Sequence, residues 1–214
     1  MVTIGFLHTS PVHPPAFHDL LTELAPQAME RHLVDESLLA DARAGRPYAD
    51  RLRARLGELA GAGAEVIVCT CSTIGGTAEQ LAEQPAPEVL RIDRPMAEQA
   101  ARYPRIGVLH AVESTLAPTR ALLIEAGADA AGLRSLPCPG AWALFEAGDL
   151  AGYHAAVAQR IRAAVGGDGV DVVVLAQASM APALDLLGEL PVPVLSSPRP
   201  AVRRALRLAG VDPA

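Results

Sequence analysis

The chain has 214 residues, half of them apolar, which is enough to build a sizeable hydrophobic core. Its formal net charge of −6 argues against non-specific binding to nucleic acid or to an anionic membrane, because both are held by clustered positive charge. All 18 basic residues are arginine, which excludes a pyridoxal-phosphate Schiff base, a lysine-dependent aldolase and a P-loop NTPase. No GxGxxG follows a predicted strand, so nothing in the sequence supports a dinucleotide site.

The first ten residues, MVTIGFLHTS, contain an apolar run far too short to cross a bilayer, and they lack a basic leader. We therefore expect a buried first strand and no membrane partner. Three cysteines in a chain of this length do not make a disulfide framework, which favours a reducing compartment. The cytoplasm is the expected location.

Short apolar runs rich in Val, Ile and Leu alternate with longer Ala, Leu, Arg and Glu stretches of helical spacing. In chain order the runs are residues 2–8, 31–34, 65–70, 89–93, 105–110, 132–136, 170–176 and 192–196. This alternation predicts an α/β fold of β-α units around mainly parallel sheets. Runs such as EVIVCT and DVVVLA have no polar alternate residue, which is typical of strands covered by helices on both faces.

Two blocks of sequence occur twice in the same order. IGFLHTS from Ile4 resembles IGVLHAVEST from Ile106, 102 residues later, and VIVCTCSTIGG from Val66 resembles VVVLAQASMAP from Val172, 106 residues later. Because the two separations nearly agree, they predict a duplicated half of about a hundred residues, with a four-stranded unit in each copy.

The loops after these repeated strands carry small polar side chains. They are His8-Thr9-Ser10, Cys71-Ser72-Thr73, Glu113-Ser114-Thr115 and Gln177-Ala178-Ser179. In open parallel sheets, ligands bind beyond the carboxyl ends of the strands, where helix N-termini offer N–H donors. The set is poor in positive charge and rich in hydroxyl and N–H donors, which is what binding a carboxylate by hydrogen bonds requires.

Cys71 is the candidate for chemistry because it directly follows a buried strand and precedes a predicted helix. A helix N-terminus favours the thiolate over the thiol. Cys69, inside the strand, is expected to be a small buried hydrophobe, and Cys138, bounded by prolines, an incidental loop thiol. A metal or redox pair of Cys69 and Cys71 is disfavoured, because C-x-C lacks a second pair of ligands at zinc spacing and is not C-x-x-C.

The motifs CTCSTIGG and VVLAQASMAP and the closing PVPVLSSP together resemble the aspartate/glutamate/hydantoin racemase superfamily, which also contains maleate isomerases and arylmalonate decarboxylases. The resemblance implies two α/β lobes related by a pseudo-twofold axis, residues 1–95 with 197–214 and residues 96–196, each a mainly parallel four-stranded sheet flanked by helices. It further implies a substrate carboxylate held between the lobes, no cofactor, no metal and a possible homodimer. In the racemases, one cysteine from each lobe faces the α-carbon, and one thiolate removes a proton while the other thiol returns one.

Gln177 stands where the resemblance implies the second cysteine. An amide has no useful pKa near neutrality, so Gln177 can position a substrate or donate a hydrogen bond but cannot abstract a proton. One-sided chemistry fits this sequence, either protonation of a planar enolate by Cys71 or addition of Cys71 to an unsaturated acid. If another group replaces the missing thiol, the candidates in the correct loops are His8, His110 and Glu113.

The sequence therefore predicts a cofactor-independent isomerase of the racemase superfamily that acts on a small carboxylic acid, with Cys71 and Gln177 at the catalytic positions. The residues expected to hold carboxylate or enolate oxygens are His8, Ser10, Ser72, Thr73, Ser114, Thr115, Ala178 and Ser179. Two alternatives stay open: a decarboxylase or lyase on the same scaffold, and a carboxylate-binding protein without activity.

Three further features have structural interpretations. Asp35-Glu36 is expected to cap a helix, with a place in the cleft as the alternative. Asp93-Arg94 favours an ion pair, local or between the lobes, over catalysis. Trp142 and Phe145 are predicted to share a helix face, for packing or as a wall of the substrate pocket.

Overall fold

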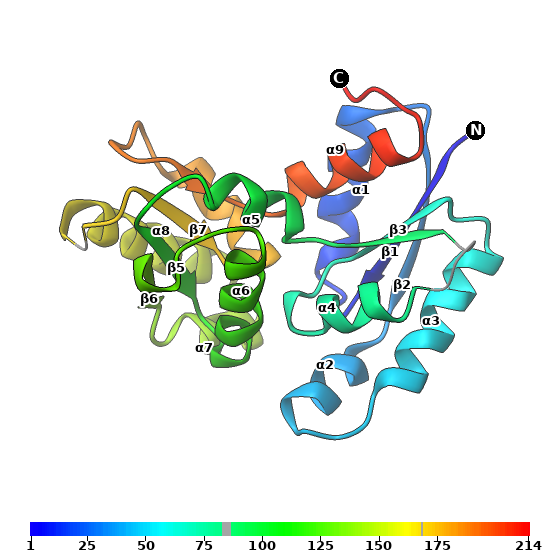
Figure 1. Ribbon diagram of the computed structural model, residues 1–214, viewed down its shortest axis with the longest axis horizontal. Helices are drawn as coiled ribbons and strands as arrows, with labels where there is room; N and C mark the ends of the chain where they lie inside the picture. Colours follow the sequence, from blue (N-terminus) through cyan, green and yellow to red (C-terminus); the bar gives the residue numbers. More distant parts are fainter. Residues whose placement is uncertain (83–86, 168) are drawn as a thin grey trace. The chain divides into compact units, whose positions relative to one another are not determined.

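The computed structural model describes residues 1–82, 87–167 and 169–214. The chain forms two compact units (Figure 1): unit 1 is Met1–Arg94 with Pro198–Ala214, and unit 2 is Pro95–Ser197. Each boundary lies one residue from a lobe boundary predicted from the sequence. In the part of the chain that is described, no helix is both long and apolar enough to cross a membrane.

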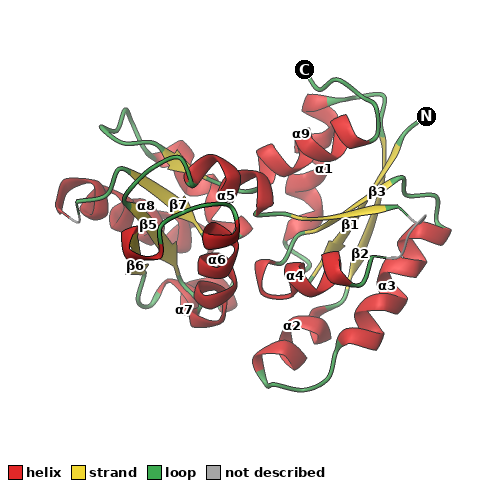
Figure 2. Cartoon of the chain, viewed as in Figure 1, coloured by secondary structure: helices red, strands yellow, loops and turns green. Residues whose placement is uncertain are grey.

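Unit 1 is a four-stranded parallel sheet of order β2-β1-β3-β4. Its elements are β1 (Thr3–His8), α1 (His13–Leu24), β2 (Met29–Val34), α2 (Glu36–Arg43), α3 (Ala49–Gly61), β3 (Val66–Cys69), α4 (Ser72–Gln80), β4 (Glu88–Arg91) and α9 (Pro198–Leu208). Helices cover both faces of the sheet (Figure 2), with α3 and α4 packing on one and α1 and α9 on the other. The apolar runs form strands here because both faces of each central strand are buried.

Unit 2 repeats this architecture with the strand order β6-β5-β7-β8, again all parallel. Its elements are α5 (Arg94–Ala100), β5 (Ile106–His110), α6 (Glu113–Glu125), η1 (Ala130–Gly132), β6 (Leu133–Pro137), α7 (Ala141–Glu146), α8 (Leu150–Gly167), β7 (Val172–Leu175), η2 (Ala178–Leu186) and β8 (Val194–Leu195). One apolar cluster joins its sheet to α7, α8 and η2, and a second joins it to α5 and α6. The predicted fold class, two parallel four-stranded sheets flanked by helices, is confirmed.

The two sheets also share their register, as a duplicated half requires. Ile4 pairs with Val66 in unit 1, and Ile106 pairs with Val172 in unit 2, so both predicted sequence separations are carried into the pairing of the strands. Gly5 and its counterpart Gly107 lie where neighbouring side chains approach the strand closely: a Cβ on Gly5 would lie 2.9 Å from that of Ala64, and one on Gly107 would lie 2.5 Å from Cδ1 of Leu136. Equivalent backbone positions therefore exist in the two units.

The helix that follows each final strand belongs to the other unit. Helix α5 follows β4 and packs in unit 2, whereas α9 follows β8 and packs on β3 and β4 of unit 1. The repeats differ at the helix after the third strand: α4 is an α-helix, whereas its counterpart η2 is a 3₁₀ helix with Pro182 inside it. Proline has no N–H to donate within a helix, so the regular α pattern is interrupted there.

Candidate functional site

Cys71 and Gln177 occupy equivalent positions at the carboxyl edges of the two sheets. Each stands two residues beyond the end of the third strand of its unit, which ends at Cys69 in unit 1 and at Leu175 in unit 2. Each is also the N-cap of the helix that follows, with extended backbone angles of φ −112° and ψ 112° for Cys71 and φ −129° and ψ 135° for Gln177. The repeat thus places a thiol in one unit where it places an amide in the other.

The Cys71 thiol is partly exposed and makes no capping hydrogen bond to the helix that it precedes. The N-terminus of α4 has unpaired N–H groups and a partial positive charge, which favour an anion there. Cys69 differs: it is fully buried, its thiol donates to the carbonyl of Cys71 at 3.9 Å, and burial raises its pKa. The prediction that Cys69 is a buried hydrophobe is confirmed.

Arg91 at the end of β4 fastens the start of α4, a contact that the sequence analysis missed. Its Nη2 donates to the carbonyl of Ser72 at 3.4 Å, while Nε and Nη2 donate to the two carboxylate oxygens of Asp93 at 2.7 and 3.0 Å. Asp93 is fully buried, so this bidentate pair replaces its hydration. The ion pairing expected at Asp93-Arg94 is thus local, with Arg91 as the partner of Asp93 and Glu79 as the partner of Arg94.

Two glycines of the CTCSTIGG motif make room for that arginine. A Cβ on Gly75 would lie 2.8 Å from the Cβ of Arg91, and one on Gly76 would lie 3.2 Å from its Nη1. The first distance is shorter than any that packed carbon atoms adopt, so a side chain at position 75 would push α4 away from β4. The sequence signal for this contact was the pair of glycines followed by an arginine at the end of the next strand.

Gln177 is held by the loop between β5 and α6. Its side-chain oxygen accepts hydrogen bonds from the N–H groups of Ala111 at 2.7 Å and Val112 at 3.1 Å, and the residue is buried. The equivalent N–H groups of unit 1 belong to Thr9 and Ser10, and within residues 1–82, 87–167 and 169–214 neither donates to another group of the protein. The loop after β5 therefore binds the side-chain oxygen of Gln177, whereas the N–H groups of the equivalent loop after β1 are available to a ligand.

The predicted hydroxyl donors fall into two groups. Thr73 and Ser114 are each the second residue of a helix, and their hydroxyl oxygens are shielded from water with no hydrogen-bond partner in the described structure. Thr115 instead donates to the carbonyl of Val112 at 2.7 Å, and the Ser179 hydroxyl pairs with Tyr153 at 2.9 Å. The hydroxyls of Thr115 and Ser179 therefore already have hydrogen-bond partners within unit 2.

The remaining residues predicted to contact a substrate also lie at the carboxyl edges of the two sheets. Ser10 is half-buried in the turn before α1, where its carbonyl accepts from the N–H of His13 at 3.4 Å. Ser72 is buried as the first residue of α4, and Ala178 is the first residue of η2. The structure thus brings Ser10, Ser72 and Thr73 to the edge of unit 1 that carries Cys71.

His8 and His110 end the first strand of each unit and are buried. Both ring nitrogens of His8 are engaged, Nδ1 with the Thr70 hydroxyl at 2.9 Å and Nε2 with Nδ1 of His32 at 2.8 Å. Burial, assisted by neighbouring histidines, lowers the pKa of His8 to about 3. His110 contacts the Ser135 hydroxyl at 2.9 Å through Nε2, and its Nδ1 lies 3.7 Å from the exposed carboxylate of Glu113. Burial also lowers the pKa of His110.

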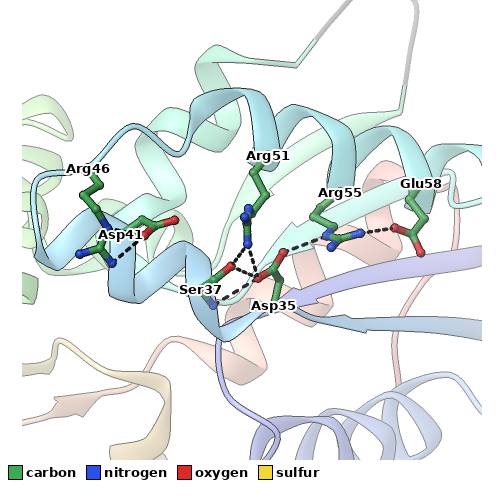
Figure 3. A network of polar contacts seen from close by, with 7 residues as sticks. All are labelled: Asp35, Ser37, Asp41, Arg46, Arg51, Arg55 and Glu58. Atoms are coloured by element: carbon green, nitrogen blue, oxygen red, sulfur yellow. Dashed lines mark hydrogen bonds and ion pairs between the residues drawn. The ribbon is translucent and has the colours of Figure 1, made fainter.

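Asp35 caps α2, as the sequence predicts. Its carboxylate accepts from the N–H of Ser37 at 3.2 Å and from Nε of Arg55 at 2.9 Å, and Arg51 lies on its other side at 3.9 Å (Figure 3). Burial by itself would raise the pKa of Asp35, but the hydrogen bonds from Ser37 and Arg55 outweigh it, and the pKa falls below its usual range. The side chain is therefore committed to a local network of charges.

Trp142 and Phe145 do share a face of α7, with ring centroids 4.7 Å apart and planes inclined by 19°. Phe145 in turn meets the ring of the buried Tyr153 at 5.3 Å. Cys138 was expected to be an incidental loop thiol, but it is buried in the same apolar cluster, where it donates to the carbonyl of Ala156 at 3.7 Å. Burial raises its pKa, so Cys138 belongs to the core of unit 2.

Comparison with known proteins gives one family. The family described as Asp/Glu/Hydantoin racemase matches residues 16–205. Similar solved structures include an aspartate racemase from Picrophilus torridus, with a TM-score of 0.73, 13% identity and coverage of 100% of this chain and 96% of that one. An allantoin racemase from Klebsiella pneumoniae has a TM-score of 0.67 at 21% identity, covering 100% and 91% of the two chains. A structure of arylmalonate decarboxylase has a TM-score of 0.61 at 17% identity, covering 97% and 92%. No curated protein matches the sequence.

Proposed function

Because the chain belongs to the Asp/Glu/hydantoin racemase family, we propose that it is a cofactor-independent enzyme that moves a proton on a small carboxylic acid with one thiol, that of Cys71. One observation carries the proposal: equivalent positions of the two units hold a partly exposed thiol at Cys71 and a buried amide at Gln177. A thiol can exchange a proton near neutral pH, whereas an amide cannot.

In this reaction the Cys71 thiolate removes a proton next to the substrate carboxylate, or the thiol protonates the corresponding enolate. Both steps pass through an enolate with added negative charge on its carboxylate oxygens, and fixed N–H and hydroxyl donors stabilise such charge. The N–H groups of Thr9 and Ser10 and the unpartnered hydroxyl of Thr73 are the donors available in unit 1. In unit 2 the available hydroxyl is that of Ser114.

The other proposed binding residues act through their positions. Ser72 and Ala178 contribute backbone donors at the starts of α4 and η2. His8, Thr115 and Ser179 use their side chains within their own units, so we assign them to holding the loops that contact the substrate. We separate the two groups by whether each side chain already has a hydrogen-bond partner within the protein.

Gln177 has a different part in the proposal. Its amide oxygen is fixed by two backbone N–H groups, which leaves the NH₂ group to donate to the substrate. Without a second titrating group at that position, the proton is delivered or removed from one face. A symmetric two-thiol racemisation is therefore not the proposed reaction.

A decarboxylase or lyase is the second candidate, and a specific observation favours it. Protonation of an enolate after loss of carbon dioxide needs one acid, and this chain has a thiol at only one of the two equivalent positions. The similar arylmalonate decarboxylase structure has the same fold. A carboxylate-binding protein without activity is the third candidate, because Gln177 could bind an acid without reacting.

Deuterium exchange followed by NMR separates these candidates. The protein is incubated in deuterated water with amino acids, hydantoins, substituted malonates and maleate. The proposal expects one acid to gain deuterium at the carbon next to its carboxylate, with one handedness of product. Loss of carbon dioxide from a malonate selects the decarboxylase. If no acid exchanges and Cys71 reacts with iodoacetamide no faster than a free thiol, the proposal of an enzyme fails.

Two further proposals concern the setting of the enzyme. The odd, small number of cysteines favours the cytoplasm, and the family suggests a homodimer. Sedimentation of the purified protein tests the second: a single species at about twice the 22.3 kDa of the chain supports a dimer, and one at the chain mass refutes it.

A further inference from the structure

A row of polar side chains runs in unit 1 from an exposed histidine to the residue before Cys71. We call it the histidine chain, and its members are His18, Glu30, His32, His8 and Thr70. Its successive contacts are His18 Nδ1 to Glu30 Oε1 at 2.6 Å, Glu30 Oε2 to His32 Nε2 at 3.2 Å, His32 Nδ1 to His8 Nε2 at 2.8 Å, and His8 Nδ1 to Thr70 Oγ1 at 2.9 Å. Thr70 then donates to the carbonyl of Leu7 at 3.0 Å.

The Thr70 hydroxyl has two acceptors within reach, the carbonyl of Leu7 at 3.0 Å and Nδ1 of His8 at 2.9 Å, and the one it donates to sets the direction of every hydrogen bond in the chain. When Thr70 donates to Leu7, it accepts from His8, which places a hydrogen on Nδ1 of His8. His8 is fully buried and uncharged, because burial lowers its pKa to about 3, so its Nε2 carries a lone pair. Consequently Nδ1 of His32 is the donor between the two rings, whose planes are inclined by only 16°.

In this arrangement the contact between His32 and Glu30, at the outer end of the chain, lacks a hydrogen unless His32 carries an added proton. With its hydrogen on Nδ1, an uncharged His32 would aim the lone pair of Nε2 at Glu30 Oε2, 3.2 Å away. Both atoms are shielded from water, so neither can turn to solvent for compensation. One added proton on Nε2 of His32 converts this repulsion into an attractive contact.

We propose that unit 1 binds one proton on Nε2 of His32, facing Glu30, and that this proton sets the direction of the Thr70 hydroxyl and thereby the reactivity of the neighbouring Cys71. When the proton leaves, His32 keeps one hydrogen, now on Nε2 and facing Glu30. His8 must then donate from Nε2 and accept at Nδ1, and Thr70 turns its hydroxyl from Leu7 to His8. The two rings hold three hydrogens on nitrogen before the change and two after it, with one proton released to water.

The groups around the chain are consistent with a proton held at its outer end. Asp19 adds negative charge near His18, and Arg31 donates to the carbonyl of Glu30 at 2.9 Å. His13, on α1, lies with its ring centroid 6.0 Å from that of His8, and burial lowers its pKa to about 4, so it stays neutral. In the described part of the chain, no cluster of three or more His, Cys, Asp or Glu is arranged to hold a metal ion instead.

Unit 2 lacks such a device at the equivalent positions. The counterpart of His32 is Ser135, whose hydroxyl contacts His110 at 2.9 Å, and the counterpart of Thr70 is Ala176. A serine hydroxyl can donate or accept by rotation, so His110 needs no added proton. The chain therefore belongs to the unit that carries the thiol.

The consequence for catalysis depends on the proposed function, whereas the proton itself does not. His8, His32 and Glu30 are positioning residues that act on Cys71 through Thr70. Nitrogen-15 NMR of the histidine rings tests the proton directly, without a substrate. As pH rises, the hydrogen of His8 should move from Nδ1 to Nε2 in the same titration step in which His32 goes from two N–H groups to one. The proposal is overturned if His8 keeps one tautomer while His32 titrates.

A variant sharpens this test. In Glu30→Gln the side-chain NH₂ donates to Nε2 of His32 without an added proton, so His8 should keep its hydrogen on Nδ1 at every pH. Glu58→Gln, which changes an exposed carboxylate of α3 outside the chain, should retain the wild-type switch. A Glu30→Gln variant that still switches His8 contradicts the proposal.

The link to Cys71 is read from its rate of alkylation by iodoacetamide as pH changes. Wild-type protein should show an additional inflection at the pH where His8 changes tautomer, and Glu30→Gln should lose it. A curve without that inflection refutes the positioning role. Neither measurement uses turnover, so both results stand if the exchange experiment rejects the proposed enzyme.

Discussion

The two units have one backbone plan and different chemistry at equivalent positions. Their strand order and register are the same, yet Cys71 corresponds to Gln177. The differences extend behind these residues, where Thr70 corresponds to Ala176 and the buried Arg91 to Ser196. In unit 1, Arg91 is hydrogen-bonded to the start of the helix that follows the thiol, and the histidine chain ends at the residue before it. In unit 2, the N–H groups of the equivalent loop bind the side-chain oxygen of Gln177.

The duplicated fold has become asymmetric through a few side chains. The strands decide where a side chain stands, and a few buried polar residues decide what that side chain can do. Because the two N–H donors that bind the Gln177 oxygen have free counterparts at Thr9 and Ser10, the donors for a substrate oxygen are retained in the unit with the thiol.

The largest effect should come from removing the thiol. Cys71→Ala should lower turnover by about 10²–10⁴-fold, the range typical of a lost acid or base, while leaving the melting temperature within a few degrees. The residue is partly exposed at a strand end, so little packing is lost. Cys138→Ala, which removes a buried thiol in unit 2, should keep turnover and lower stability. Full activity of Cys71→Ala would refute its role.

The second effect concerns the buried ion pair of Arg91 and Asp93 in unit 1. Arg91→Met leaves Asp93 buried without its partner and should cost about 3–5 kcal/mol of unfolding free energy. Arg105→Met breaks a solvent-exposed ion pair with Asp171 in unit 2 and should cost much less, because water screens the charges. Urea titrations compare the two variants. Equal costs would show that Arg91 does not fasten α4 as inferred.

The third effect is an acid sensitivity that differs between the units. The folded protein keeps His8 neutral down to about pH 3, whereas the unfolded chain protonates it near 6.5, so stability is full above pH 6.5 and falls on acidification. His8 contributes at most about 1.4 kcal/mol per pH unit to that slope. His8→Gln should flatten the loss of stability between pH 6.5 and 5, and His110→Gln should flatten it less. An unchanged slope in His8→Gln would contradict the buried neutral state.

Much of the fold could be predicted because it follows from apolar patterning. Runs of Val, Ile and Leu bounded by turns predicted all the strands described, and the repeated blocks predicted the shared register. The cap at Asp35 and the paired rings of Trp142 and Phe145 were also found, since both depend on contacts within four residues. The positions of Cys71 and Gln177 at matching strand ends follow from the same patterning.

The parts that were missed depend on contacts between distant segments. Arg91 contacts the start of α4 because β4 pairs with β3, the strand that leads into α4. His32 contacts His8 because β2 pairs with β1, the strand that ends at His8. Cys138 looked like a loop thiol because the flanking prolines hide the cluster that buries it. A single sequence does not show which residues from distant segments lie within hydrogen-bonding distance of one another.

Replacing Gln177 by cysteine tests the central claim, that unit 1 alone supplies the proton-transfer group. The handedness of deuterated product is measured by NMR with a chiral reagent for wild-type protein and for Gln177→Cys and Gln177→Ala. Wild type should give one enantiomer, Gln177→Ala should stay one-sided with weaker binding, and Gln177→Cys should racemise the product because a thiol then stands at both equivalent positions. Efficient racemisation by the wild type, unchanged in Gln177→Cys, would contradict the account and direct attention to His110 and Glu113.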